Sequence, residues 1–232
     1  MSVVALLLCA GRGERLGLEV SKAQAPLAGR PLFAWSLEAL ERCEAVDGVV
    51  VVGPARSLKE TLAAAGMPAA KVVTWVEGGR ERQESVTRGL AALPVECTIV
   101  AIHDSARALV RPELVSRVVA DALQHGAAIA AVPLADTLKR ASLDVVEDTV
   151  ARASLWCAQT PQVFRRDWIE EAHRATRTQE VPGRHATDDA VLVEALGHRV
   201  HLTMSDSLNF KITTPRDLEL AEAWLGRAPA RT

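Results

Sequence analysis

The sequence predicts an α/β fold in which a mainly parallel sheet is flanked by helices. Short apolar runs rich in β-branched residues alternate with amphipathic segments, and this alternation is typical of parallel sheets. The runs lack polar alternation, as expected of strands that are buried on both faces. In addition, 49% of the 232 residues are hydrophobic, which is enough for one sizeable core.

The strands and helices are expected in a regular order. Pro112 at an early helical position and Gly126 after the last turn mark one helix. Thr214 and Asp217 form a capping-box pattern that opens the last helix. The expected strands are residues 3–8, 48–52, 71–76, 98–102, 127–132 and 199–203, and the expected helices are residues 31–44, 80–93, 112–125 and about 214–225.

Residues 133–162 interrupt this order because they contain no long helical stripe. Residues 137–141 and 148–152 are interpreted as two short strands around a turn at residues 142–144. We expect a β-arm that leaves the sheet, and such projections often contact a partner subunit. The length equals roughly one and a half typical domains, which favours a single domain over residues 1–232 with the arm as an excursion.

Composition and charge exclude several classes of protein. The 27 basic and 29 acidic residues give a net charge of −2, and the aromatic residues are five Trp and three Phe with no Tyr. A nucleic-acid-coating protein is therefore not expected. The four cysteines have no zinc-binding or CxxC spacing. No signal peptide and no membrane span are expected, because no basic segment precedes the first apolar run and the runs are short. We expect a reduced, cytoplasmic protein.

The glycine-rich turn after the first strand is a candidate phosphate site. Its backbone N–H groups, from Cys9, Ala10, Gly11 and Gly13, can cradle phosphate. The spacing is neither GxGxxG nor that of a Walker loop. Three nearby cations favour a triphosphate site over the alternative, a tight turn with solvated basic residues: Arg12, Arg15 and Lys22.

Two further turns carry candidate ligand-binding residues. At Gly79 a flat base can approach the backbone while Ser85 offers a donor or acceptor; the alternative is a plain turn before a charged helix. Directly after the strand at residues 98–102, ligands of an open parallel sheet are expected. Asp104 there suits a metal or a ribose hydroxyl, and Arg107 can pair with phosphate. The small residues Ser105 and Ala106 leave room for a sugar, and the alternative is that Asp104 caps a turn or helix.

The later segments give weaker signals. His103 is interpreted as structural because a single His beside a buried strand is more often structural than catalytic. Thr160 precedes a proline in an extended or turn dipeptide, and Thr187 has the composition of a helix N-cap. Lys211 lies inside an otherwise apolar strand end and needs an anionic partner.

Taken together, these segments resemble the 2-C-methyl-D-erythritol 4-phosphate cytidylyltransferase family over roughly residues 3–225. The ordered set is more specific than any one motif: AGxGxR…K, GGxxRxxSV, HDxAR, DTxK, R…LWxAQTPQ, TDDA and FKITTPxDL. The sequence departs from the usual family pattern at Leu8, Cys9, Ser21, Ala23, Ser105 and Ala108.

The resemblance implies a Rossmann-like nucleotidyltransferase fold and a homodimer joined through the β-arm. It implies that CTP and the phosphate of methylerythritol phosphate condense to 4-diphosphocytidyl-2-C-methyl-D-erythritol with release of pyrophosphate. Mg²⁺ is expected mainly on the CTP phosphates, without a dedicated protein metal site. Such chemistry needs no strong general base, because the attacking phosphate oxygen is already anionic.

The resemblance also implies residue roles. Arg15 and Lys22 would stabilise charge at the α-phosphate, whereas Arg152 and Lys211 would position the substrate phosphate. Nucleotide contacts are expected from Cys9, Ala10, Gly11, Gly13, Gly79, Ser85, Asp104, Ser105 and Ala106. Polyol phosphate contacts are expected from Asp104, Arg107, Thr137, Arg152, Thr160, Thr187 and Lys211, partly across the dimer.

Two alternatives remain open at this point. A ribitol 5-phosphate cytidylyltransferase of the same superfamily needs cations for the same two phosphates. A non-catalytic nucleotide-binding relative is disfavoured by the presence of the charged residues Arg15, Lys22, Asp104, Arg152 and Lys211.

Overall fold

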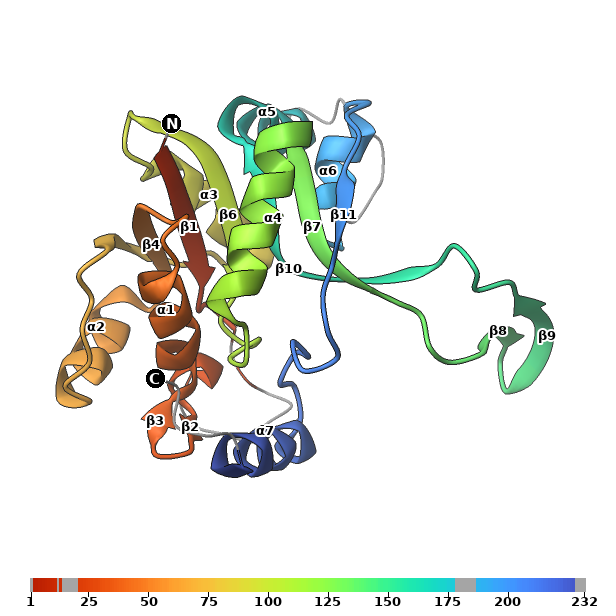
Figure 1. The fold of residues 1–232 in the computed structure, drawn as a ribbon, viewed down its shortest axis with the longest axis horizontal. Coiled ribbons are helices and arrows are strands. Elements are labelled where there is room, and N and C mark those ends of the chain that lie inside the picture. The colour runs from red at the N-terminus through yellow and green to blue at the C-terminus, as the bar shows by residue number, and fades with distance from the viewer. Residues whose placement is uncertain (1, 12, 14–20, 178–186, 228–232) are drawn as a thin grey trace.

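A seven-stranded sheet forms the centre of the molecule (Figure 1). The computed structural model describes residues 2–11, 13, 21–177 and 187–227. The strand order is β11-β7-β10-β6-β1-β4-β5, and β10 runs antiparallel to both of its neighbours. The central strands are β1 (Ser2–Leu8), β4 (Gly48–Gly53), β5 (Val72–Glu77), β6 (Cys97–Asp104), β7 (Ala127–Pro133), β10 (Trp156–Arg165) and β11 (His201–Met204).

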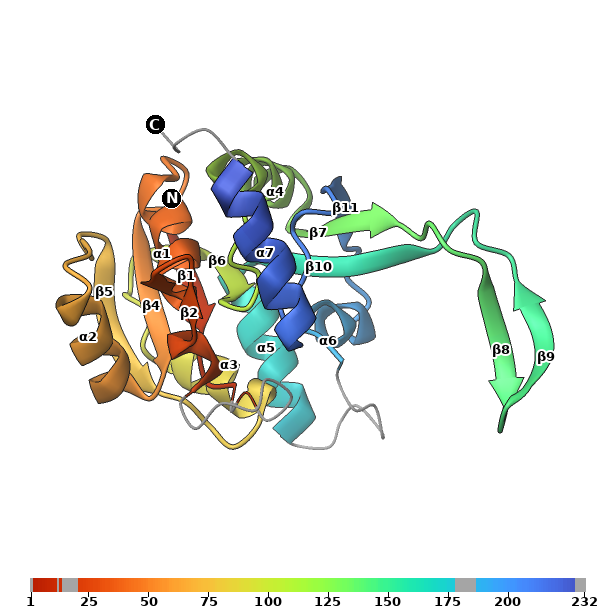
Figure 2. The ribbon, with the colours of Figure 1, turned by 90° about the horizontal axis from the view of Figure 1, so that it is seen from below.

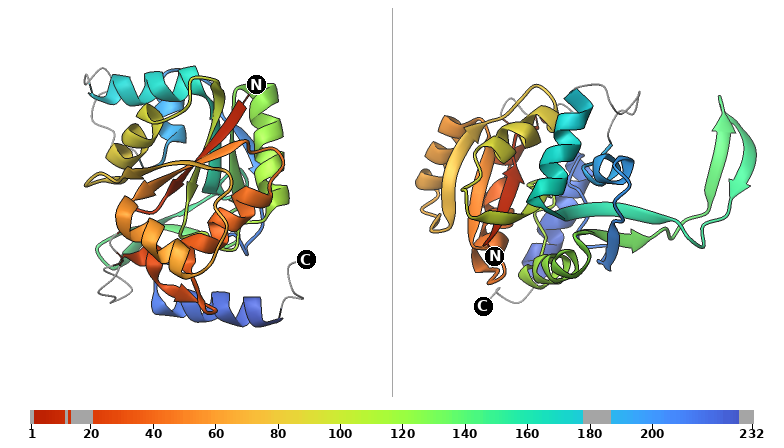
Figure 3. Two further views of the ribbon diagram at one scale, coloured as in Figure 1. Left: turned by 90° about the vertical axis from the view of Figure 1, so that its left-hand side faces the viewer. Right: turned by 90° about the horizontal axis from the view of Figure 1, so that it is seen from above.

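Helices cover both faces of this sheet (Figures 2 and 3). The first core lies on the face that packs against α1, α2 and α4, and the second lies under α3, α5 and α6. A small third core joins α7 to the hairpin of β2 and β3. The bounds are α1 (Leu32–Arg42), α2 (Ala55–Ala64), α3 (Arg82–Ala91), α4 (Pro112–His125), α5 (Arg166–Arg177), α6 (Ala190–Ala195), α7 (Pro215–Arg227), β2 (Pro26–Leu27) and β3 (Arg30–Pro31), with a 3₁₀ turn η2 (Lys22–Gln24).

The expected mainly parallel α/β architecture is confirmed, and so are the end signals of two helices, α4 and α7. Gly126 ends α4 in the left-handed region at φ 88°, which favours glycine. The Thr214 hydroxyl accepts from the Asp217 N–H at 3.3 Å, and the Asp217 carboxylate accepts from the Thr214 N–H at 2.8 Å. These two bonds form the predicted capping box at the start of α7.

Burial on both faces is restricted to the inner strands. Every residue of β4 is buried, whereas β5 and β11 are partly exposed along their length. They lie at the two edges of the sheet. The expectation of burial on both faces is therefore wrong for these two strands, because each has a neighbour on one side only.

The arm is a two-stranded ribbon that projects from the body (Figure 2). It consists of β8 (Leu138–Ser142) and β9 (Val145–Val150). The predicted limit at residue 162 is wrong, because β10 pairs with β6 and β7 inside the central sheet. Pro161 and the polar residues around it conceal this strand in the sequence. Helices α2, α5 and α6 also come in addition to the four expected helices.

No helix in the described part of the chain is both long and apolar enough to cross a membrane.

Candidate functional site

A cavity of about 250 Å³ opens at the carboxyl edge of the sheet, where open parallel sheets bind ligands. Its walls come from the turn after β1, from η2, from the β5–α3 turn, from the end of β6 and from the segment before α7. The lining residues are Leu8, Cys9, Ala10, Gly11, Lys22, Ala23, Gly79, Arg80, Glu81, Arg82, Ser85, Asp104, Ser105, Ala106 and Lys211. The structure thus brings most of the predicted nucleotide-site residues together.

The turn after β1 folds back onto η2. The Lys22 N–H donates to the Gly11 carbonyl oxygen at 3.3 Å. Gly13 has φ 73°, and a Cβ there would lie 3.0 Å from the Lys22 Cβ, so any other residue would be strained. Arg12 and Arg15 lie outside the described residues.

Cys9 lies at the floor of this turn and is 1% exposed. Burial raises the pKa of its thiol to about 12. The side chain is therefore protonated at neutral pH and acts as a small apolar filler rather than as a nucleophile.

The β5–α3 turn lines the cavity beside the turn after β1, since a Cβ on Gly78 would lie 2.6 Å from Ala10 Cβ. The Gly79 N–H donates to the Ser85 hydroxyl at 2.9 Å, and that hydroxyl donates to the Glu81 carbonyl oxygen at 3.1 Å. A Cβ on Gly79 would lie 2.5 Å from Glu84 Cβ. Ser85 therefore fixes the shape of this turn, and the absence of a side chain at Gly79 leaves room for the side chain of Glu84.

Asp104 is the electrostatic centre of the cavity. Its Oδ2 lies 2.6 Å from Lys211 Nζ, and its Oδ1 lies 3.2 Å from Arg82 Nε. Burial alone would raise the pKa of Asp104, but the charges of Arg82 and Lys211 outweigh it and hold this pKa well below its usual range. Asp104 is thus the anionic partner that Lys211 needs. Lys211 itself lies in an irregular segment rather than in a strand.

Thr160 and Arg107 lie behind the cavity and are absent from its lining. Thr160 is 4% exposed; its hydroxyl accepts from the Asp104 N–H at 3.1 Å and lies 3.2 Å from His103 Nδ1. The Arg107 guanidinium donates to the carbonyl oxygens of Asn209 at 2.7 Å and Ala158 at 3.4 Å. In this arrangement both side chains support the wall that carries Asp104.

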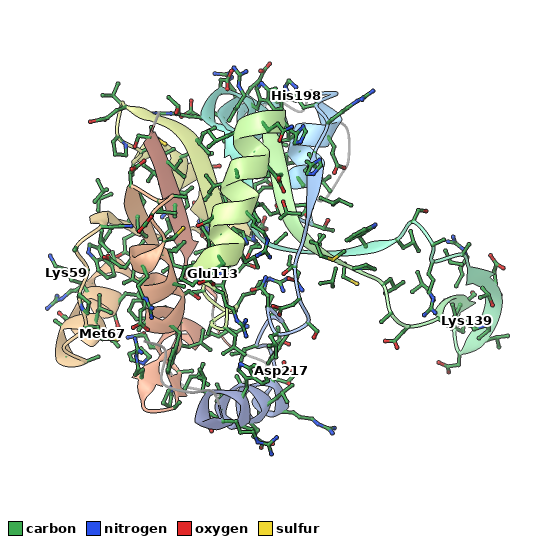
Figure 4. All side chains as sticks on the ribbon, in the orientation of Figure 1. Lys59, Met67, Glu113, Lys139, His198 and Asp217 are labelled. Atoms are coloured by element: carbon green, nitrogen blue, oxygen red, sulfur yellow. The ribbon has the colours of Figure 1, made fainter. Side chains whose placement is uncertain are left out.

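Thr187 and the arm residues lie apart from the cavity lining. Thr187 is exposed and is not the helix N-cap, because Asp189 occupies that position of α6. Thr137 and Arg152 flank the two arm strands and are exposed. Figure 4 shows Lys139 on the same arm, far from Glu113 on the body. These side chains do not line this chain's own cavity.

Arg82 has no role assigned from the sequence, although the motif GGxxRxxSV contains it. It contacts two carboxylates, those of Asp104 and Asp189, the latter at 2.7 Å. The arginine of the motif is the only sequence signal, and its partners lie 22 and 107 positions away.

The buried side chain of His103 is expected to make the free energy of unfolding depend on pH. Burial lowers its pKa to about 4 from 6.5, so the folded ring is neutral at pH 7. Between these values the unfolded chain binds the extra proton, and stability therefore falls as pH decreases, by up to about 1.4 kcal/mol per pH unit. Urea unfolding of His103→Gln should show a shallower slope from pH 6.5 to 4. An unchanged slope would contradict this account of His103.

Comparison with known proteins decides the family. The family model for 2-C-methyl-D-erythritol 4-phosphate cytidylyltransferase matches residues 3–227. The chain belongs to this family. A 2-C-methyl-D-erythritol 4-phosphate cytidylyltransferase from Geobacillus kaustophilus is 44% identical over 226 residues, which cover 97% of each chain. One from Synechococcus sp. (strain WH7803) is 42% identical and covers 96% of this chain and 98% of that protein.

Solved structures of the family share the fold. The cytidylyltransferase from Thermus thermophilus aligns with a TM-score of 0.78 at 35% identity and covers 98% of this chain and 100% of that one. Family membership confirms the resemblance and the nucleotidyltransferase fold that the motifs predict.

Proposed function

We propose that the chain transfers the cytidylyl group of CTP to the phosphate of 2-C-methyl-D-erythritol 4-phosphate. The products are 4-diphosphocytidyl-2-C-methyl-D-erythritol and pyrophosphate. The observation that carries this proposal is the cavity at the carboxyl edge, lined by a glycine turn, Lys22 and the Asp104–Lys211 pair, in a chain of this family.

The reaction needs positioning and charge rather than a base. An oxygen of the substrate phosphate attacks the α-phosphorus of CTP, and the bond from that phosphorus to the oxygen bridging to the β-phosphate breaks. The nucleophile is already anionic, so neither His103 nor Cys9, both buried, has to remove a proton. Holding the two reacting anions in line can lower the activation barrier by about 7–11 kcal/mol.

We assign the charged residues by their place in the fold. Lys22 lines the cavity beside the glycine turn and would face the CTP phosphates, and the family resemblance gives Arg15 the same role. Lys211 also lines the cavity and is 41% exposed, so it can contact an incoming phosphate. Asp104, between Arg82 and Lys211, would accept hydrogen bonds from ribose or polyol hydroxyls.

Mg²⁺ is proposed as the cofactor. In the described part of the chain, no group of three or more His, Cys, Asp or Glu side chains could hold a metal ion, and both Asp104 oxygens already contact cations. This donor set suits a metal carried in mainly by the CTP phosphates. When bound there, Mg²⁺ neutralises charge on the triphosphate.

We also propose that two chains form a dimer in which each arm reaches the partner's cavity. The arm presents Leu143 at 98%, Val145 at 70% and Val146 at 57% exposure, and such an apolar ribbon is expected to be covered. Thr137 and Arg152 would then complete the polyol phosphate pocket from the partner subunit.

A panel of acceptors tests the function. Pyrophosphate release with CTP and Mg²⁺ is measured for methylerythritol phosphate and for ribitol 5-phosphate, with mass spectrometry of the product. We expect turnover with the first substrate. Turnover with ribitol 5-phosphate alone would contradict the proposal, and turnover undiminished by excess EDTA would contradict its metal part.

A further inference from the structure

Four charged side chains of alternating sign form a continuous row behind and into the cavity. The Asp189 carboxylate lies 2.7 Å from the Arg82 guanidinium, Arg82 lies 3.2 Å from Asp104, and Asp104 lies 2.6 Å from Lys211. The exposed fraction of the side chain is 2% at Asp189, against 31% at Arg82, 12% at Asp104 and 41% at Lys211, and these last three residues line the cavity. The row therefore connects the interior of the protein to the cavity, and Asp189 forms its buried end.

Asp189 is held by three separate elements. The Gln162 side-chain oxygen of β10 accepts from the Asp189 N–H at 3.1 Å and from the Ala190 N–H at 3.2 Å. On α5, His173 Nε2 lies 3.1 Å from Asp189 Oδ1. On α3, Arg82 contacts the other carboxylate oxygen. His173 and Arg82 therefore position this carboxylate, and Gln162 holds the backbone that carries it.

The Arg82 guanidinium contacts the carboxylates of both Asp104 and Asp189, and this double contact determines how Arg82 meets Asp104. Arg82 reaches Asp104 with Nε and Asp189 with a terminal nitrogen. Arg82 thereby contacts only Oδ1 of Asp104, and Oδ2 stays with Lys211. A guanidinium without its second carboxylate favours a two-point contact with the remaining one. Such a contact would compete with Lys211 for Asp104.

We infer that Asp189 is a positioning residue for the nucleotide site, acting through Arg82 on Asp104 and Lys211. This inference rests on the proposed function, because it assigns CTP to the cavity. It also connects two regions, since Asp189 ends the segment that carries Thr187, a predicted polyol phosphate contact, while Asp104 lines the nucleotide cavity. CTP is the ligand whose affinity should report on the row.

The first test is direct binding of CTP with Mg²⁺ by titration calorimetry. Asp189→Asn keeps the size of the side chain and removes its charge. We expect the CTP dissociation constant to rise on the order of 10-fold to 100-fold, with a matching rise in KM for CTP. Asp167→Asn is the matched control, because Asp167 is an exposed carboxylate that pairs with the neighbouring Arg165 and does not line the cavity; it should bind CTP like the wild type.

A double-mutant cycle separates positioning from general destabilisation. If Asp189 acts through Arg82, Asp189→Asn should have little further effect on CTP binding in an Arg82→Gln background. Effects that multiply in the double variant would overturn the inference, as would wild-type affinity in Asp189→Asn. A purely structural role would lower the unfolding midpoint and the active fraction but leave the dissociation constant of the folded protein unchanged.

Arg82→Lys gives a second route if Asp189→Asn does not fold. It keeps the positive charge but loses the fork that contacts two carboxylates at once, so it should weaken CTP binding to a similar extent. Wild-type affinity in Arg82→Lys would overturn the inference. Because binding is measured without acceptor, a wild type that binds CTP but does not use methylerythritol phosphate would refute the proposed reaction and leave this test intact.

Discussion

Replacing Lys22 by alanine is expected to lower kcat for cytidylyl transfer by about 10²–10³-fold. Lys22 lines the cavity at the point where the chain returns to the glycine turn. The turn that carries it is anchored to α2, because the Gln24 side-chain amide donates to the hydroxyls of Ser57 and Thr61, each at 2.7 Å. A cation held in this way stabilises developing charge at the α-phosphate without reorganisation during the reaction.

A matched substitution controls for loss of a lysine as such. Lys59 is an exposed residue of α2 and points outward in Figure 4, so Lys59→Ala should keep wild-type kcat. In urea unfolding, the free energy of unfolding of both variants should lie within about 0.5 kcal/mol of the wild-type value. Wild-type kcat in folded Lys22→Ala would contradict the role of Lys22, and an equal loss in Lys59→Ala would show that the effect is not local.

Arg152→Ala is expected to lower kcat/KM for methylerythritol phosphate on the order of 10²-fold and to leave the CTP dissociation constant unchanged. Arg152 lies beyond β9 on the arm and does not line the cavity of its own chain. Its loss should therefore affect the acceptor phosphate alone. Arg56→Ala is the control, because this side chain is 90% exposed on α2 and its ion pair with Glu60 lies at the surface, where such a pair contributes little.

A weakened CTP dissociation constant in Arg152→Ala would place this side chain in the nucleotide site and contradict the assignment. Calorimetry with CTP and steady-state kinetics with varied acceptor, run on the same preparations, measure the two effects separately.

Much of the fold could be predicted from the sequence because the inner strands are nearly uninterrupted apolar runs. Strand β4 is the clearest example, since GVVVVG is buried at every position. Strand β10 was concealed, because its Gln and Thr side chains make buried hydrogen bonds to partners distant in sequence, such as that of Thr160 to Asp104. The register of its pairing with β7 also shifts between Ala158 and Gln162, which is typical of a β-bulge.

The residues that form the site could largely be predicted from the sequence, but the contacts between them could not. Turns after parallel strands meet at one edge, so Gly79, Asp104 and the first glycine turn could be assigned together. The ion pair of Asp104 with Lys211 joins residues 107 positions apart, and no local pattern encodes it. The same holds for Asp189. The segment TDDA that contains it indicates only a helix start, whereas its carboxylate contacts Arg82.

In the proposed dimer, each active site combines the cavity of one chain with the arm of its partner. Mixed dimers carrying two different tags test it most directly, with one subunit Arg152→Ala and the other Lys211→Ala. If the arm acts across the dimer, one site carries both substitutions and the other carries neither. The purified mixed dimer should then recover about half of the wild-type turnover, although each variant homodimer is nearly inactive. A mixed dimer no more active than the two homodimers would place Arg152 and Lys211 in the same chain's site and contradict the account.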